Sequence, residues 1–147
     1  PVCPEQLGGM STPRIPSERL NGCVFNRAGE DVTSHFLRGA EEALRLAKLY
    51  NCQTAIMKER SPSCGRGQIY DGTFSGVKRA GEGVTTSLLR AHGITVYSEK
   101  ELTEEFLQEL VKAEEQIKKL RSSLREFGFI NPVIIDKDYN VLLLKRY

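Results

Sequence analysis

The chain has 147 residues, of which 39% are hydrophobic and 27% are charged, and its formal net charge is +2. This length accommodates one domain with a small appendage, the composition is that of a soluble globular protein, and the charge is too small to indicate nucleic-acid binding by itself. No apolar stretch approaches the ~20 residues of a membrane-spanning helix and no signal-peptide pattern is visible, so we expect a cytoplasmic protein with reduced thiols and no membrane partner.

The first third of the chain predicts an irregular segment followed by a helix. Residues 4–34 are rich in Pro, Gly, Ser and Arg and lack a sustained period. A helix is then expected to start with Thr33 or Asp31 as its cap and to run to about Tyr50. Its apolar face is marked at helical spacing by Phe36, Leu37, Ala40, Leu44 and Ala47.

The middle of the chain alternates strands and helices. Residues 54–57 form a short apolar run typical of a buried strand, residues 84–91 predict a helix after a Gly-Glu-Gly loop, and residues 94–97 predict a second strand. Short connections between such elements favour an α/β fold with a Rossmann-like, mostly parallel sheet flanked by helices. The loop of residues 60–67 follows the first strand, at the sheet edge where α/β proteins bind ligands.

The tail predicts a long helix. Ser98 and Glu101 have the spacing of a capping box, and Gly128 is a typical helix stop. Between them apolar residues recur at alternating steps of four and three: Leu102, Phe106, Leu110, Ala113, Ile117, Leu120, Leu124 and Phe127. This heptad-like seam is typical of a packing helix or of a homodimer formed through residues 102–127.

Two strands, at residues 129–136 and 141–147, are expected to close the tail as a β-hairpin. The change of character after the α/β pattern predicts two domains, residues 1–101 and residues 102–147.

Two of the four cysteines stand in polar turns flanked by proline: Cys3 in Val-Cys-Pro-Glu and Cys64 in Ser-Pro-Ser-Cys-Gly. A thiolate is both a metal ligand and a nucleophile, and the two arginines that flank Cys64 would stabilise one. Without a Cys-x-x-Cys pair, these residues alone leave a functional site and a pair of ordinary loop thiols equally open. Cys23, which alternates with Val24 and Phe25 in a predicted short strand, and Cys52, at the entrance of another strand, are interpreted as structural.

A series of motifs in consecutive order adds to this pattern. They are Pro-Val-Cys-Pro-Glu-Gln-Leu-Gly-Gly (residues 1–9) with Thr-Pro-Arg (12–14), Asn-Arg-x-Gly-x-Asp-Val-Thr (26–33), Lys-Glu-Arg-Ser-Pro-Ser-Cys-Gly (58–65), Tyr-Asp-Gly-Thr-Phe-Ser-Gly (70–76) and Gly-x-Gly-Val (81–84). Through them the chain resembles the 2-thiouracil desulfurase family over residues 1 to about 102.

The resemblance implies a 4Fe–4S cluster held by three cysteines, whose open iron takes the sulfur of a thiolated pyrimidine while water converts the thiocarbonyl to a carbonyl and sulfide is released. Cys3 and Cys64 match two cluster ligands, Glu5 matches the acid/base residue and Ser61 matches a polar active-site residue. Soft sulfur ligands and a soft substrate sulfur suit iron, and a carboxylate can carry the protons of hydrolysis.

In the family pattern the third cysteine ligand and the first strand of the sheet would lie upstream of Pro1. We therefore expect that the chain holds no stable cluster without them. The expected partner is a free thiolated nucleobase or nucleoside, or a modified RNA.

Residues 117–136 are similar to the start of ParB-like nuclease domains, without the nucleotide-binding motifs that would follow. The alternative functions are therefore a DNA-associated adaptor and a non-catalytic interaction module. A DNA partner is disfavoured because the sequence has no basic stripe.

Overall fold

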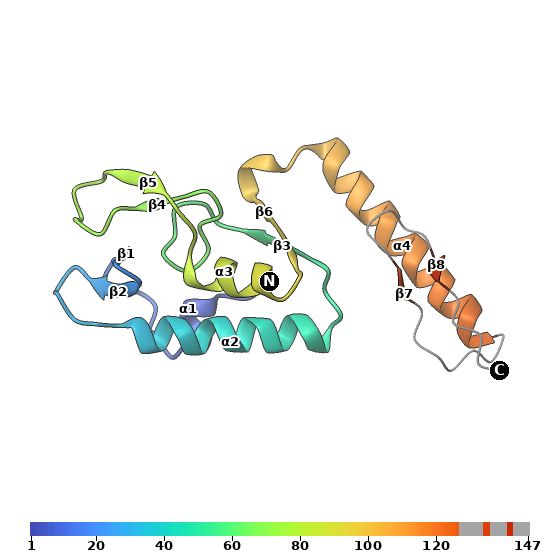
Figure 1. The fold of residues 1–147 in the computed structure, drawn as a ribbon, viewed down its shortest axis with the longest axis horizontal. Coiled ribbons are helices and arrows are strands. Elements are labelled where there is room, and N and C mark those ends of the chain that lie inside the picture. Colours follow the sequence, from blue (N-terminus) through green and yellow to red (C-terminus); the bar gives the residue numbers. More distant parts are fainter. Residues whose placement is uncertain (127–133, 136–140, 143–147) are drawn as a thin grey trace. The chain divides into compact units, whose positions relative to one another are not determined.

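The computed structural model describes residues 1–126, 134–135 and 141–142, and it consists of two compact units, residues 1–102 and 103–147 (Figure 1). The elements of the first unit are α1 (Pro4–Leu7), β1 (Ser17–Leu20), β2 (Cys23–Asn26), α2 (Thr33–Leu49), β3 (Thr54–Met57), β4 (Gln68–Tyr70), β5 (Lys78–Ala80), α3 (Val84–Ala91), β6 (Thr95–Ser98) and the 3₁₀ turn η1 (Glu99–Glu101). Those of the second unit are α4 (Glu104–Glu126), β7 (Ile134–Ile135) and β8 (Val141–Leu142).

The strands of the first unit pair in two ways. β3 and β6 are parallel, with Thr54 opposite Thr95 and Met57 opposite Ser98. β1–β2 and β4–β5 are antiparallel hairpins. The predicted α/β class, with parallel strands and flanking helices, is confirmed, whereas the β4–β5 hairpin had no counterpart in the sequence interpretation.

Two clusters of buried apolar side chains hold the first unit together, and helices α2 and α3 contribute to both clusters. One joins α2 and α3 to the parallel strands through Leu44, Leu89, Ile94 and Val96, and the other joins them to β2 through Val24, Val32, Phe36, Ala40 and Val84. The apolar stripe of α2 is therefore its core face, as predicted. Leu37 is the exception, being 51% exposed because it lies at the margin of that stripe.

The ends of α2 follow from local side-chain chemistry. Asp31 Oδ1 accepts the N–H of Thr33, the first residue of the helix, at 2.9 Å. The Thr33 hydroxyl instead accepts the N–H of Val24. The N-cap residue is Val32, which makes no side-chain cap hydrogen bond, so neither of the two predicted caps, Asp31 and Thr33, occupies that position. Asn51, just beyond the helix, has a left-handed backbone (φ 53°), which confirms it as the stop.

The link between the units corrects one prediction. Ser98 and Glu101 do form a capping box, but on η1 rather than at the start of the long helix. Leu102 is extended (ψ 108°) and ends this turn, and the Thr103 hydroxyl accepts the N–H of Phe106 at the start of α4. Ser98 and Glu101 therefore cap the start of η1, and Thr103 caps the start of α4.

The second unit is a long helix and a two-stranded antiparallel hairpin, β7–β8. Phe106, Leu110, Ala113 and Ile117 of the predicted seam are half-buried on α4. The predicted stop at Gly128, the seam residue Phe127 and the turn of residues 137–140 lie outside the described residues. Within the part of the chain that the structure describes, no helix is both long and apolar enough to cross a membrane.

Candidate functional site

The turn that carries Cys3 and Glu5 is positioned by close contact between α1 and α2. Cys3 caps α1, and a Cβ atom on Gly39 would lie 1.9 Å from the carbonyl oxygen of Pro4. A Cβ atom on Gly8 would lie 2.0 Å from the carbonyl oxygen of His35. Glycine at both positions therefore lets the two helix backbones touch, which sets where Cys3 and Glu5 lie.

Hydrogen bonds fasten the far end of α1. The Gly8 carbonyl accepts from Arg38 Nε at 3.0 Å and from Arg38 Nη2 at 2.6 Å, and His35 Nδ1 lies 2.9 Å from the same oxygen. The last turn of α1 is thus tied to α2 by side chains as well as by packing.

The loop that carries Ser61 and Cys64 is docked on the N-terminus of α3. The first amides of the helix donate into the loop: Val84 N to Pro62 O at 2.9 Å and Thr85 N to Ser63 O at 2.9 Å. Ser63 is fully buried and its hydroxyl lies 2.9 Å from that of Thr85, while Thr86 Oγ1 donates to the Cys64 carbonyl at 2.8 Å. The N-terminus of α3 therefore fixes the cysteine loop, because the first N–H groups of the helix need acceptors and the loop carbonyls supply them.

Glu59 organises the same loop from its other side. Its Oε1 accepts backbone N–H groups of Arg66, Gly67 and Gln68 at 3.0–3.2 Å, with a longer contact of 3.3 Å from Arg60. Burial alone would raise the pKa of Glu59, but the N–H donors outweigh it and lower the pKa to about 2.

The two segments meet where Ser61 contacts Glu5, and Arg14 joins Glu5 to Cys3 within the first segment. Arg14 Nε donates to Glu5 Oε2 at 2.6 Å, and Arg14 Nη2 lies 3.4 Å from the Cys3 sulfur. Ser61 Oγ lies 3.5 Å from Glu5 Oε1 and accepts the N–H of Cys64 at 3.1 Å. The four predicted site residues, Cys3, Glu5, Ser61 and Cys64, are therefore brought into one site.

The environment of Cys64 differs from that of a surface thiol. Burial raises its pKa, and the negative charges of Glu5 and Cys3 add to this effect, while hydrogen bonds with Ser63 and Ser61 act in the opposite direction. A bound metal would reverse this balance, because it favours the thiolate.

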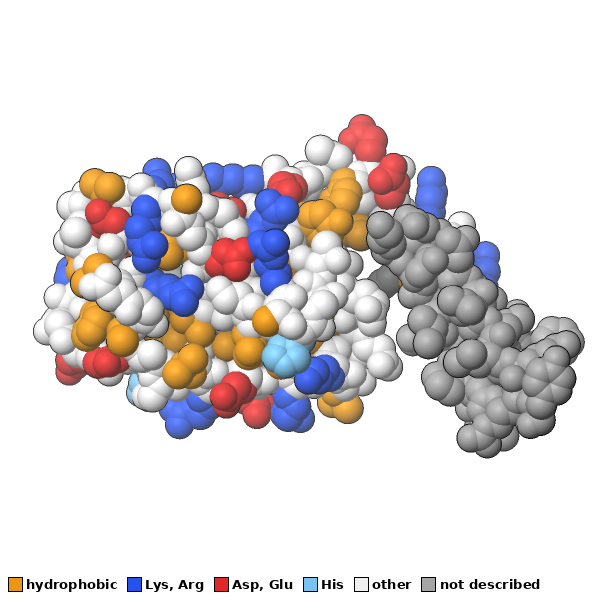
Figure 2. Space-filling view, viewed as in Figure 1, with side chains coloured by type: hydrophobic (Ala, Val, Ile, Leu, Met, Phe, Trp, Pro, Cys, Tyr) orange, Lys and Arg blue, Asp and Glu red, His pale blue; other side chains and the backbone are white. Residues whose placement is uncertain are grey.

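A cleft of about 640 Å³ opens beside these residues, and both Glu5 and Ser61 line it. The rest of its wall mixes charged and aromatic side chains, including Arg14, Tyr70 and Phe74. On the face that Figure 2 shows, Lys and Arg side chains of the first unit are interspersed with Asp and Glu.

The other two cysteines lie away from this site. Cys23 is half-buried in β2, and Cys52 is exposed beyond the end of α2, where it lines a separate pocket with His92. Among the described residues, no group of three or more His, Cys, Asp or Glu side chains is arranged to hold a metal ion.

Two residues that sequence reasoning gave no role take part in the site. Arg14 belongs to the Thr-Pro-Arg motif, so its position in that motif was a usable signal. Glu59 belongs to the Lys-Glu-Arg-Ser-Pro-Ser-Cys-Gly motif, but its role was not visible in the sequence, because its partners are backbone amides brought together by the loop fold.

The model of the 2-thiouracil desulfurase family matches residues 1–101. The chain belongs to this family. A relative of known sequence, the uncharacterized protein YbbK of Bacillus subtilis (strain 168), is 47% identical over 70% of this chain and 75% of its own length. A solved structure, that of the [4Fe-4S]-dependent thiouracil desulfidase TudS, matches with a TM-score of 0.70 and 52% identity, over 74% of this chain and 72% of that chain. The family prediction and the fold class are both confirmed.

Proposed function

We propose that this member of the 2-thiouracil desulfurase family is an iron–sulfur-dependent desulfidase acting on thiolated pyrimidines such as 2-thiouracil. The observation that carries the proposal is the meeting of Glu5 with Ser61 beside one cleft, with Cys3 joined to Glu5 through Arg14 and Cys64 joined to Ser61 by a hydrogen bond. The family's description and the name of TudS support the same chemistry. We assign the activity to the domain that contains residues 1–101, and not to the tail.

Cys3 and Cys64 fit a 4Fe–4S cluster by the chemistry of their donors, since thiolates are the usual protein ligands of such clusters. The described residues contribute these two thiols and no complete group of three metal ligands. That the third cysteine lies upstream of Pro1 stays a prediction. When bound through three protein ligands, the cluster supplies an open iron, a soft Lewis acid suited to the substrate sulfur.

Glu5 is the proton carrier in this proposal. Arg14 occupies its Oε2 at 2.6 Å, whereas Oε1 has a long contact of 3.5 Å from the Ser61 hydroxyl, so Oε1 is the oxygen that a water molecule in the cleft can approach. Oε1 can take a proton from that water as the water oxygen bonds to the thiocarbonyl carbon, and can return it as the C–S bond breaks. One water is consumed, its oxygen becomes the carbonyl oxygen, and the sulfur leaves as sulfide with the two hydrogens.

Ser61 directs a hydrogen bond into the same space. Its hydroxyl oxygen accepts the N–H groups of Ser63 and Cys64, both at 3.1 Å. A hydroxyl has two acceptor lone pairs and one donor, so these two bonds leave the O–H to donate to Glu5 Oε1, which lies 3.5 Å away. Ser61 thereby links the position of the cysteine loop to that of the proton carrier.

The test compares anaerobically purified protein, expressed from its complete gene, with four variants. We expect Cys3→Ser and Cys64→Ser to lose most of the bound iron and the release of sulfide from 2-thiouracil. Glu5→Gln should keep the iron and lower turnover by about 100-fold or more, the usual contribution of a general acid–base group. Cys52→Ser is the matched control, because Cys52 is exposed and lines a different pocket.

Iron and sulfide content, measured beside sulfide release, separates the steps. A native protein that binds no iron under anaerobic conditions would rule out the proposal. Equal loss of iron in Cys52→Ser and Cys64→Ser would remove the ligand assignment.

The remaining parts of the sequence interpretation stay predictions. These are a modified RNA as substrate, a homodimer through residues 102–127, cytoplasmic localisation, and the alternative of a non-catalytic or DNA-associated module with a ParB-like tail. No observation on the described residues favours the alternative function over desulfidation.

A further inference from the structure

The loop of residues 71–76 forms part of the wall of the cleft that also contains Glu5 and Ser61. Phe74 of this loop is half-buried and lines the cleft. The Arg27 guanidinium carbon lies 5.8 Å from the centroid of the Phe74 ring. An aromatic ring with one face covered by a cation therefore borders the space where the reacting groups meet.

Phe74 is held in an unfavourable backbone conformation. Its φ of +55° is in the left-handed region, which a bulky side chain rarely adopts. Glu18 supports this conformation, because its Oε2 accepts the N–H groups of Phe74 at 2.9 Å and Gly72 at 3.0 Å. Glu18 is only 8% exposed, so these bonds form away from solvent.

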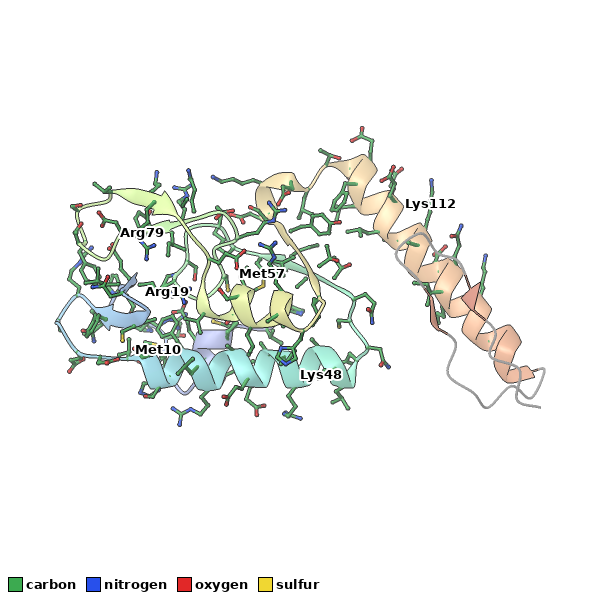
Figure 3. All side chains as sticks on the ribbon, in the orientation of Figure 1. Met10, Arg19, Lys48, Met57, Arg79 and Lys112 are labelled. Carbon is green, nitrogen blue, oxygen red and sulfur yellow. The ribbon has the colours of Figure 1, made fainter. Side chains whose placement is uncertain are left out.

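The surrounding hairpins fix the loop further. A Cβ atom on Gly72 would lie 2.7 Å from Leu20 Cβ, which shows how closely the loop packs on β1. Arg79 Nη2 donates to the carbonyl of Arg19, and Arg19 Nη1 donates to that of Glu82, which joins β1 both to β5 and to the loop before α3 (Figure 3). Strain that the fold maintains in this way is typical of ligand-binding segments.

We infer that Phe74 is the specificity-determining aromatic wall on which the flat ring of the substrate stacks. The inference rests on the proposed function and adds the surface that recognises the substrate ring. Proteins commonly hold a nucleobase by stacking it on an aromatic side chain, and phenylalanine offers a ring face without a competing polar group. Because Arg27 covers one face of the ring, a planar ligand has a single face on which to stack.

The predicted substrate class is therefore a planar heteroaromatic thiocarbonyl compound. An open-chain thioamide or thiourea carries the same reactive bond but has no ring to stack. It is expected to be a much poorer substrate, mainly through a higher KM.

The experiment measures kcat and KM for 2-thiouracil, together with uracil binding by equilibrium dialysis, on the anaerobically purified protein from its complete gene. Phe74→Leu keeps an apolar side chain at the same backbone position and removes the aromatic face. It should raise KM and the uracil dissociation constant by about 5- to 150-fold, the range for losing one base–aromatic stack. Phe74→Tyr should restore both values to within a few-fold of the native protein.

The matched control is Val77→Ala, in the same segment, because Val77 is 54% exposed and is not among the cleft-lining residues. It should leave both constants unchanged. If Phe74→Leu binds uracil as tightly as the native protein and keeps its KM, the aromatic wall is refuted while the desulfidase proposal stands. If the native protein releases no sulfide from 2-thiouracil, it is the proposed function that fails.

Discussion

The two segments that carry the site cysteines are held in place by different forces. The turn with Cys3 is held mainly by packing, since α1 touches α2 through glycine backbones at Gly8 and Gly39. The loop with Cys64 is held mainly by hydrogen bonds from α3 and from backbone amides to Glu59. The first arrangement is sensitive to added volume at Gly39, whereas the second is sensitive both to added volume at Gly83 and to loss of charge at Glu59.

This difference shows how a metal or catalytic site can be built from segments that are far apart in the chain. Packing fixes the distance between two helices but does not orient the polar side chains that they carry. Here Arg14 orients two of them, because it donates to Glu5 and contacts the Cys3 sulfur. A hydrogen-bonded loop fixes its own backbone, so Ser61 and Cys64 are oriented together. Three predictions test the comparison.

The largest effect on stability is expected from added volume at the two close backbone contacts, that of Gly39 with Pro4 and that of Gly83 with Ser63. Gly39→Ala would place a Cβ 1.9 Å from Pro4 O, and Gly83→Ala would place one 2.2 Å from Ser63 O. Because backbone atoms cannot yield as side chains do, each should lower the free energy of unfolding by about 3 kcal/mol. For Gly39→Ala this cost exceeds the ~1 kcal/mol that alanine adds to a helix. Urea unfolding of the variants measures it.

Gly67→Ala is the matched control, because a Cβ there meets no atom within 4 Å and the backbone needs no left-handed conformation. It should leave the unfolding midpoint unchanged. Equal midpoints for Gly39→Ala and Gly67→Ala would show that α1 does not depend on the close backbone contact.

The second largest effect is expected from loss of the Arg14 guanidinium. This loss should lower the catalytic rate rather than the stability of the fold. Arg14→Gln removes the groups that hold Glu5 Oε2 and approach the Cys3 sulfur. We expect kcat for 2-thiouracil to fall by about 10- to 100-fold, part of the contribution of a general acid–base group, with little change in the unfolding midpoint. Arg14→Lys should recover part of the loss, and steady-state kinetics on both variants decides the matter. A large fall in unfolding midpoint with unchanged kcat would instead make Arg14 a structural residue.

The smallest effect is expected from Glu59→Gln, and it should depend on pH. The amide is a weaker acceptor than the carboxylate for the loop N–H groups, so we expect a loss of about 1–2 kcal/mol at pH 7 after allowance for solvent screening. The folded-state pKa of Glu59, about 2, lies below its ordinary value of 4.5, so its stabilisation is full above pH 4.5 and declines as pH falls toward 2. Urea unfolding of both proteins at pH 7, 5 and 3 tests this. A difference between them that stays constant down to pH 3 contradicts the assignment.

The elements that the sequence predicted well are those governed by local pattern. α2, β3, α3 and β6 lie within a residue or two of their predicted bounds, because apolar spacing and capping residues act over a few positions. The start of α4 was misplaced, because the Ser98 box met the expected spacing but closes a short 3₁₀ turn instead. The β4–β5 hairpin was missed because its strands are short and β5 is exposed along its whole length, so no alternating pattern marks them.

What the sequence determined by itself was the set of chemical groups. Two cysteines in polar turns, a nearby carboxylate and a series of ordered motifs were sufficient to indicate the family, and four site residues could be named from them. The tertiary structure alone decided how these residues meet: that Arg14 joins Glu5 to Cys3, that Glu59 gathers loop amides, and that Phe74 borders the same cleft. The physical reason is that hydrogen bonds and close contacts depend on distances in space, and residues far apart in sequence acquire those distances only when helices and loops pack.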